Sequence, residues 1–303
     1  MKFSTQKPID LILNGLFDTY AQRVPAVRQI TKLLIEKGCI GSQSDIVNDH
    51  IAFRTMGIPH LGIASFEKIF LHHGYQKMDH YHFGIKKLDA YWYKPPMEHY
   101  PRVFISELRV GDLSKQAQKI IGHYTQNIHS DPVDGLDLDH AENVVDFLHL
   151  PLWNTPTYDD YQALLSESEY GAWVLYNRYY LNHYTISVHA LPKPYNQLEN
   201  FNELLKSAGI ALNNAGGEIK TSPDSLLRQS STVANKISSE FADGDTHTIA
   251  GSYVEFAERL VLPKYINVPK KLLTTTHRRE GFEAGNADKI FESTFSSQIQ
   301  RKN

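Results

Sequence analysis

The sequence predicts an α+β fold in which two βαβββ modules form a partly open β-barrel, with further helices at the N-terminus and between the modules. The first observation behind this prediction is an order of one strand, one helix and three strands that occurs twice in the 303 residues. The second is a composition of 41% hydrophobic and 21% charged residues, which is typical of a globular protein with a full core. The third is a long stretch of helical apolar spacing ahead of the first module.

We expect these elements to form a single domain over residues 1–303. Its parts are N-terminal helices at 9–38, a first βαβββ module at 45–111, a helical insertion at 112–175, and a second module with a C-terminal segment at 176–303. Pro25 divides the N-terminal stretch into two helices, because a proline ring disrupts a helix interior.

The first module begins with a strand at 50–55, where β-branched and aromatic residues predict extended chain. A helix at 64–73 follows and ends at Gly74. Three alternating segments complete the module, at 81–85, 88–94 and 102–110. The insertion after it is predicted to be mostly helix and loop, with a helix at 114–124.

The second module repeats this order. A strand is predicted at 180–190 and a helix at 196–207. Three more strands are predicted near 211–220, 228–233 and 251–262. The two modules have no obvious sequence identity, so the duplicated order of elements is the main evidence for the architecture.

The overall charge gives no reason to expect nucleic acid or an anionic membrane as a partner, because the net charge is −3 and the pI is near 6.6. Met1–Asp10 has no apolar region like that of a signal peptide, and no window of about 18 apolar residues is present. Cys39 is the only cysteine, which excludes an intramolecular disulfide. We therefore expect a cytoplasmic location, and the oligomeric state is left open.

The strand at 50–55 carries the most informative pattern. Residues two apart share a face of a strand, so His50, Ala52 and Arg54 point one way while Ile51 and Phe53 point the other. If the first face lies against solvent, this is an ordinary half-buried strand. If it lies against a cavity, His50 is available as a metal ligand and Arg54 can bind a carboxylate.

Two later strands offer matching ligands. His183, Thr185 and Ser187 share one face of the first strand of the second module, and Tyr253 and Glu255 share one face of the last strand. His50, His183 and Glu255 together form the donor set of a 2-His-1-carboxylate site, which is typical of non-haem Fe(II) oxygenases. Spacing alone does not establish this site, because the ligands come from distant segments and a histidine in a strand is more often structural.

Four segments resemble those of one family. Asp49-His50-Ile51-Ala52-Phe53-Arg54-Thr55 is similar to the metal-binding opening strand of the 2-oxoadipate dioxygenase/decarboxylase family, a branch of the vicinal oxygen chelate superfamily. Asn182-His183-Tyr184-Thr185 resembles its second histidine segment, and Tyr253–Arg259 resembles its glutamate segment. The segment 281–293 resembles its C-terminal active-site segment. The matches occur in the same order and cover about residues 45–295.

The resemblance implies an enzyme that uses Fe(II) and dioxygen to convert 2-oxoadipate to 2-hydroxyglutarate and carbon dioxide. It implies that His50, His183 and Glu255 hold the iron and that Arg54 binds the distal carboxylate of the substrate. Gly285 and Asn286 in the C-terminal segment are implied to offer groups to the same substrate. One departure is that the glutamate segment ends in Ala257-Glu258-Arg259-Leu260 rather than in a Glu-Gln-Arg-Gly run, which bears on the substrate more than on the metal.

Several residues also have purely structural interpretations. Arg54 has an alternative as the buried ion-pair partner of Glu107 or Asp49. Glu107, in the last strand of the first module, is expected to be structural or to support the site rather than to be a fourth ligand. His189 lies six residues after His183, about 20 Å along a strand, and is too far away to bind the same ion.

Other polar residues are not expected to carry chemistry. Glu258 should face away from Glu255 and be structural. The pairs His72-His73 and His80/His82 are expected on surfaces without a metal. Ser293 and Thr294 have no evident neighbouring base, which argues against a hydrolase.

Two alternative functions stay open from the sequence. One is a glyoxalase-type isomerase or lyase that uses Zn²⁺ or Ni²⁺, which a fourth ligand at Glu107 would favour. The other is a non-catalytic protein that binds a small molecule in the same fold, which the intact set of His50, His183 and Glu255 disfavours.

Overall fold

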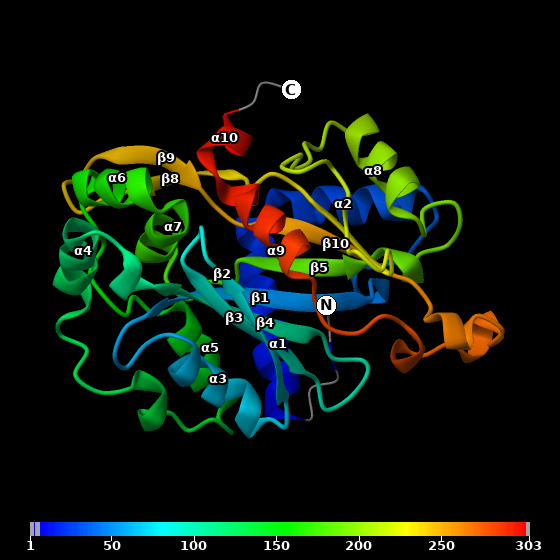
Figure 1. Ribbon diagram of the computed structural model, residues 1–303, viewed down its shortest axis with the longest axis horizontal. Helices are drawn as coiled ribbons and strands as arrows, with labels where there is room; N and C mark the ends of the chain where they lie inside the picture. The colour runs from blue at the N-terminus through cyan, green and yellow to red at the C-terminus, as the bar shows by residue number, and fades with distance from the viewer. Residues whose placement is uncertain (1–2, 4–6, 301–303) are drawn as a thin grey trace.

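The computed structural model describes residue 3 and residues 7–300. Its centre is a curled eight-stranded sheet with the strand order β2-β3-β4-β1-β5-β10-β7-β6, accompanied by helices on both faces (Figure 1). The predicted α+β class and half-barrel sheet are thus confirmed. The single-domain division with its boundaries stays a prediction.

The first half of the sheet is a βαβββ module. Its elements are β1 (Asn48–Gly57), α3 (Ile63–His72), β2 (Gln76–Phe83), β3 (Leu88–Lys94) and β4 (Arg102–Arg109). The second half has the same order and is built from β5 (His183–Ser187), α8 (Leu198–Ser207), β6 (Lys220–Thr221), β7 (Leu227–Ser231) and β10 (Tyr253–Arg259). In the sheet, β1, β4, β3 and β2 correspond to β5, β10, β7 and β6, and the halves meet where β1 pairs antiparallel with β5.

The remaining elements surround this sheet. Helices precede it, fill the insertion and follow it: α1 (Pro8–Arg23), α2 (Pro25–Glu36), α4 (Lys115–Thr125), α5 (Ala141–His149), α6 (Tyr158–Glu167), α7 (Glu169–Asn177), α9 (Ala284–Phe291) and α10 (Ser296–Ile299). A separate hairpin of β8 (Lys236–Glu240) and β9 (Thr246–Ala250) is inserted before β10. The predicted break at Pro25 is confirmed, since α2 begins at that residue.

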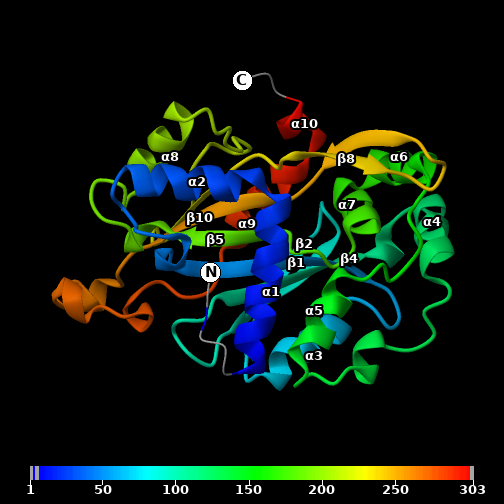
Figure 2. The same ribbon diagram turned by 180° about the vertical axis from the view of Figure 1, so that it is seen from behind.

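The two faces of the sheet have different partners. On one face, Phe53 of β1 packs against Phe66 of α3 with ring centroids 4.7 Å apart, and Tyr184 of β5 packs against Phe17 of α1 at 5.2 Å. Helices α1 and α2 are seen on this side in Figure 2, and α9 lies on the opposite side in Figure 1. The aliphatic and aromatic residues of β1 therefore fill the core, while His50 and Arg54 face the side that α9 covers.

Several predicted strands are shorter in the structure, and the one expected at 251–262 covers only Tyr253–Arg259. The strand expected at 211–220 is reduced to Lys220–Thr221, because Gly216 and Gly217 have positive φ angles of 67° and 97° that extended chain does not adopt. The strand expected at 180–190 covers only His183–Ser187 and is followed by a 3-10 turn. No helix in the described part of the chain is long and apolar enough to cross a membrane.

Candidate metal centre

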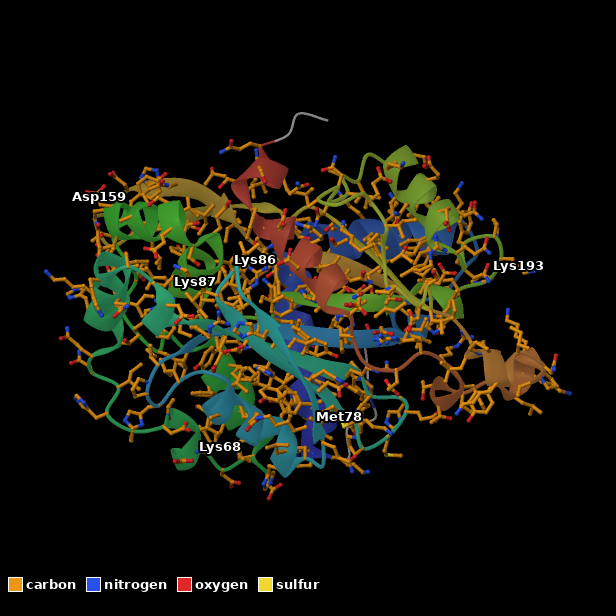
Figure 3. The ribbon with its side chains drawn as sticks, in the orientation of Figure 1. Lys68, Met78, Lys86, Lys87, Asp159 and Lys193 are labelled. Atoms are coloured by element: carbon orange, nitrogen blue, oxygen red, sulfur yellow. The ribbon has the colours of Figure 1, made fainter. Side chains whose placement is uncertain are left out.

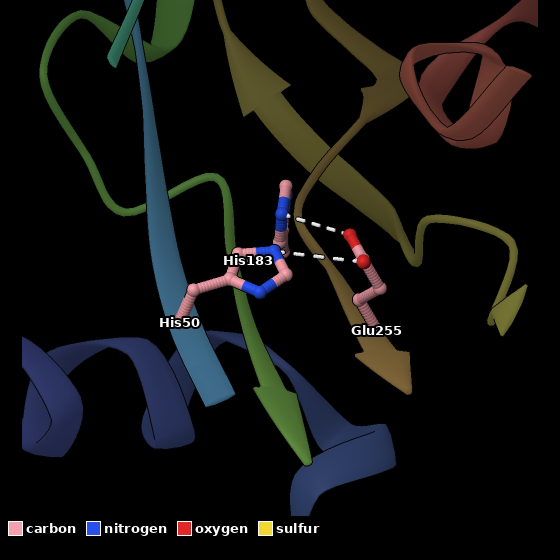
Figure 4. A group of neighbouring side chains, drawn as sticks. All are labelled: His50, His183 and Glu255. Atoms are coloured by element: carbon pink, nitrogen blue, oxygen red, sulfur yellow. Dashed lines mark ion pairs between the residues drawn. The ribbon is translucent and has the colours of Figure 1, made fainter. Parts of the chain in front are cut away.

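Three buried side chains from three neighbouring strands converge beside α9. His50 comes from β1, His183 from the start of β5 and Glu255 from β10 (Figure 4). Nε2 of His183 lies 3.0 Å from Oε2 of Glu255, and Nε2 of His50 lies 3.5 Å from Oε1 of the same carboxylate. They are at most 5% exposed. The predicted ligands thus lie together, as the register of the strands requires, since β5 pairs with both β1 and β10.

The other ring nitrogen of each histidine is held by the residue that precedes it. Nδ1 of His50 donates to Oδ1 of Asp49 at 2.8 Å, and Nδ1 of His183 donates to Oδ1 of Asn182 at 3.0 Å. Such bonds fix the orientation of the ring and direct Nε2 toward Glu255, although Nε2 of His50 also lies 3.0 Å from Oγ1 of Thr185. Neither Asp49 nor Asn182 was predicted to have this role.

Asp49 is itself fixed by a buried arginine. Nε and Nη2 of Arg259 donate to the two oxygens of the Asp49 carboxylate at 2.6 and 2.9 Å. Burial alone raises the pKa of Asp49, but the charges of Arg259 and Arg102 and the hydrogen bond with His50 hold it well below its usual value. Asp49 is therefore an anion, which strengthens its hold on the His50 ring.

Glu255 is fixed from its other side by an amide. Nε2 of Gln229 in β7 donates to Oε1 of Glu255 at 2.7 Å, and Nδ2 of Asn286 in α9 donates to Oε1 of Gln229 at 3.0 Å. Burial alone raises the pKa of Glu255, but the charges and hydrogen bonds of His50 and His183 lower it overall. The carboxylate is thus ionised and oriented, as a metal ligand must be.

The donor set and the space between the donors fit one divalent cation. Two imidazole nitrogens and one carboxylate are the ligands of the 2-His-1-carboxylate class. The cavity that they line has a volume of about 20 Å³, which is room for a single water or ion. Its other walls are mostly apolar, with Phe104, Phe282, Ala287, Ile290 and Phe291 among them.

No fourth ligand is found in the described residues. The strand β4 of the first module corresponds to β10 of the second. Glu255 lies two residues after Tyr253, which pairs with His183 in the sheet. In the first module His50 pairs with Arg102, and the residue two positions later, the counterpart of Glu255, is Phe104. Glu107 instead accepts a hydrogen bond at 2.8 Å from the backbone N–H of Ile63, at the start of α3. It supports the fold, as expected, and does not reach the cluster of His50, His183 and Glu255.

Arg54 is 1% exposed and has no carboxylate partner among the residues that the structure describes. Nη1 donates to Oγ1 of Thr294 at 2.9 Å, Nη2 donates to the backbone oxygen of Phe291 at 3.1 Å, and Nε has no partner. Burial lowers the pKa of this guanidinium. The alternative of an ion pair with Glu107 or Asp49 is therefore wrong, because Asp49 pairs with Arg259 and Glu107 caps α3.

The C-terminal segment lies over the site through α9. Lys86, labelled in Figure 3, forms ion pairs with Asp288 at 2.8 Å and with Glu292 at 3.1 Å, which fasten this segment to the β2–β3 turn. Asn286 is 3% exposed and supports Glu255 through Gln229. Gly285 has open space where a side chain would be. Contact of Asn286 and Gly285 with a substrate stays a prediction.

The remaining polar candidates are structural in the described chain. Glu258 accepts from Arg228 and from the backbone of Leu198 at the start of α8, as expected. His189 lies in the turn after β5, where its Nδ1 accepts from the backbone N–H of Arg259 at 3.2 Å. Oγ of Ser293 is 2.8 Å from Oγ of Ser231.

His72 and His73 form a surface group with Asp139, which was not anticipated. Nε2 of His72 lies 2.9 Å from Oδ1 of Asp139. An exposed cluster of this kind is common without a metal.

The comparisons with known proteins now identify the family. Residues 12–273 match the family model described as 2-oxoadipate dioxygenase/decarboxylase. A curated relative from Arabidopsis thaliana, 2-oxoadipate dioxygenase/decarboxylase, chloroplastic, is 43% identical over 302 residues, covering 96% of this chain and 78% of the relative. The chain belongs to this family. Its membership confirms the resemblance on which the prediction rested, and makes it a relative of oxidative decarboxylases.

Two solved structures resemble this member of the 2-oxoadipate dioxygenase/decarboxylase family in their fold. The hydroxyglutarate synthase of Oryza sativa, crystallised in complex with 2-oxoadipate, is 41% identical and has a TM-score of 0.86, with 96% of this chain and 93% of that chain covered. A putative glyoxalase superfamily protein of Ralstonia eutropha JMP134 has a TM-score of 0.72 at 22% identity, with 92% and 88% covered. The second likeness supports the fold alone.

The expected cytoplasmic location is wrong by the same comparison, because the Arabidopsis relative is named as chloroplastic. The expectation rested on finding neither a signal peptide nor a membrane span. Neither feature distinguishes the cytoplasm from the interior of an organelle.

Proposed function

We propose that this protein is an Fe(II)-dependent dioxygenase that decarboxylates a 2-oxo diacid, with 2-oxoadipate converted to 2-hydroxyglutarate and carbon dioxide. In this reaction the C1–C2 bond of the substrate breaks and C1 leaves as carbon dioxide. Both atoms of dioxygen enter the product, one in the new carboxylate at C2 and one in the hydroxyl group at C3. No other oxidant or reductant is required. The family membership and the complex of the rice relative with 2-oxoadipate support this proposal.

The observation that carries the substrate class is the buried charge of Arg54. A guanidinium that is fully enclosed and lacks an anionic partner is costly, unless a ligand supplies the anion. Arg54 lies four residues after His50 on the same face of β1, which is about 13 Å along the strand. That placement suits a diacid whose 2-oxo acid end lies beside His50 and whose distal carboxylate lies at Arg54, since the two side chains and a bound metal would take up part of this backbone distance.

His50, His183 and Glu255 would hold the iron. When bound there, Fe(II) would supply the chelation of the 2-oxo acid and the activation of dioxygen that the reaction requires. Asp49 and Asn182 orient the two imidazoles, and Gln229 orients the carboxylate. The rings of Phe104, Phe282 and Phe291 keep water from the reacting carbons.

The two alternative functions have less support. A four-ligand isomerase or lyase site would need a donor at Phe104, which a phenyl ring does not provide. A non-catalytic binding protein gives no reason for three buried donors around a space of one ion. The predicted substrate contacts of Gly285 and Asn286 are retained as part of the proposal, although neither lines the cavity.

Oxygen consumption tests the proposal directly. Protein reconstituted with Fe(II) under nitrogen is mixed with dioxygen and either 2-oxoadipate or 2-oxohexanoate, a monoacid of the same chain length. We expect uptake with the diacid and loss of uptake in His183→Ala. Tight binding of zinc, together with no oxygen uptake by the Fe(II)-loaded protein, would contradict the assignment.

A pair of arginine variants tests the substrate class. Arg54→Met should lower kcat/KM for 2-oxoadipate by about 100-fold and leave that for 2-oxohexanoate much less affected. Arg23→Met is the matched control. It also removes a packed guanidinium, but Arg23 contacts Asn177 and Tyr180 rather than the cluster. Equal effects of Arg54→Met on both acids would contradict the role of Arg54.

A further inference from the structure

Tyr253 is a fully buried tyrosine beside the proposed metal site. It is the first residue of β10 and lies directly opposite His183 in the sheet. Its ring stacks on the imidazole of His183 with centroids 4.7 Å apart and an angle of 26° between the planes. It is 0% exposed, and its hydroxyl has no hydrogen-bond partner among the described residues.

The side chain of Tyr253 lies near charges of both signs, those of Arg54 and Glu255. Burial raises the pKa of Tyr253, and the nearby Arg54 acts in the opposite direction. The phenol is therefore neutral and is able to donate a hydrogen bond. Arg54 Nε also has no partner among the residues that the structure describes, so two buried donors without partners lie in the same region. Buried donors without partners are few in native proteins, and a bound ligand is one way to satisfy them.

The register of the strands places Tyr253 between the two ends of the proposed substrate. Tyr253, His183 and Ala52 occupy one level across β10, β5 and β1. His50 and Arg54 lie two residues to either side of Ala52 on the same face of β1. Tyr253 is therefore level with the midpoint between His50 and Arg54, on the second strand from β1.

We propose that the Tyr253 hydroxyl donates a hydrogen bond to the distal carboxylate of the substrate, beside Arg54, and thereby selects diacids over monoacids. This inference rests on the proposed function and deepens it. A carboxylate has enough acceptor sites for both donors, since each oxygen accepts two hydrogen bonds. A monoacid leaves the hydroxyl unsatisfied, and a site built to hydrogen-bond a substrate group discriminates strongly against analogues without it.

Tyr184 provides a matched control on the neighbouring strand. It is also 0% exposed and its hydroxyl also lacks a partner among the residues described. Its ring, however, points to the opposite face of the sheet, where it contacts Phe17 and Tyr20 of α1. Tyr184→Phe therefore removes one buried hydroxyl, as Tyr253→Phe does, on the face of the sheet opposite to the proposed substrate site.

The test compares Tyr253→Phe with Tyr184→Phe by calorimetric binding of 2-oxoadipate and 2-oxohexanoate to Fe(II)-loaded protein under nitrogen. Phenylalanine keeps the stacking on His183, so metal binding is retained. We expect Tyr253→Phe to weaken the binding of 2-oxoadipate by about 10-fold or more and that of 2-oxohexanoate by less than about 2-fold. Tyr184→Phe should change neither affinity.

Two results would overturn the inference. Unchanged affinities for both acids in Tyr253→Phe would mean that the hydroxyl does not contact the distal carboxylate. An equal loss for both acids would mean that Tyr253 acts only through His183. Oxygen uptake by the wild-type protein is measured in the same series, and its absence would count against the proposed oxygenase reaction. The selection of diacids is decided by the binding data alone.

Discussion

Asp49 and His50 are consecutive in β1, yet the carboxylate of the first accepts a hydrogen bond of 2.8 Å from Nδ1 of the second. Neighbouring residues of a regular strand point to opposite faces. Here the pairing of β1 with β5 shifts its register between Asn48 and Ile51, and this irregularity accompanies the turn of both side chains toward each other. The other histidine of the cluster, His183, is held in the same way by Asn182, which carries no charge.

The charge of Asp49 should strengthen metal binding. Asp49→Asn keeps the shape of the side chain but removes the anion that faces both His50 and Arg259. We expect the affinity for Fe(II) or for a substitute such as Co²⁺ to fall about 10- to 100-fold. Competition with a chelator of known affinity measures this change.

Asp10→Asn is the control for Asp49→Asn. Asp10 is a buried carboxylate of α1 that accepts a hydrogen bond at 2.7 Å from Tyr100, away from the cluster. Its substitution should affect the free energy of unfolding and not the metal affinity. Equal metal affinities of Asp49→Asn and the wild-type protein would contradict the role given to Asp49.

The amide of Gln229 should hold Glu255 in its ligand orientation. Gln229→Leu removes the hydrogen bond to Oε1 of Glu255, so we expect weaker metal binding by about 3- to 30-fold. Asn286→Ala removes the hydrogen bond behind Gln229, together with a longer one to the backbone oxygen of Leu227, and should have a smaller effect of the same sign. Metal titration of both variants ranks their metal affinities. A larger loss of affinity in Asn286→Ala than in Gln229→Leu would mean that Asn286 contacts the metal site directly.

His189 should make the protein sensitive to mild acid. Burial lowers its pKa to about 4 from an ordinary value of 6.5, and its neutral Nδ1 accepts from the backbone of Arg259. The unfolded chain therefore binds this proton more readily, and stability present above pH 6.5 is lost as the pH falls toward 4. At pH 5 the loss relative to pH 7 is about 2 kcal/mol.

The comparison that isolates His189 is His189→Gln, which does not titrate. Urea unfolding of the two proteins at pH 7 and pH 5 gives the four free energies required. The wild-type protein should lose more stability than the variant between these pH values. Parallel losses would show that other groups carry the acid sensitivity.

Gly62 should tolerate no side chain. Its φ is +88°, and a Cβ there would lie 2.6 Å from Oε2 of Glu107 and 3.0 Å from the backbone oxygen of Met56. We expect Gly62→Ala to lower the free energy of unfolding by about 1–3 kcal/mol. Gly122→Ala, in a helix with open space around it, should leave stability unchanged or raise it by up to about 1 kcal/mol. Chemical denaturation ranks the two variants, and a stable Gly62→Ala would contradict the close contact.

The alternation of residues along the strands offered His50, His183 and Glu255 as candidate ligands, and the resemblance of four segments to the family was needed to join them into one site. The predicted strand at 211–220 failed because the positive φ angles of Gly216 and Gly217 interrupt it. The β8–β9 hairpin was missed, although Asp243-Gly244 lies at its turn and is a typical hairpin sequence.

The residues that support the ligands were harder to predict. Asn182 had a local indication, since an Asp or Asn precedes each of the two histidines. Gln229 had none, because its contact with Glu255 depends on the pairing of β7 with β10 and on the position of α9. The lack of a carboxylate partner for Arg54 could not be predicted either, because the sequence contains several acidic residues that could have paired with it.

The place of Phe104 has a consequence for how a gas reaches the cluster. Phe104 stands where the duplicated fold would put a second carboxylate, and its ring lies 4.9 Å from that of Phe282 by centroid. The side of the cluster without a protein donor is therefore covered with hydrocarbon. Dioxygen is an apolar molecule that dissolves better in hydrocarbon than in water, so under the proposed function the same rings that exclude solvent would enrich the one reactant that carries no charge.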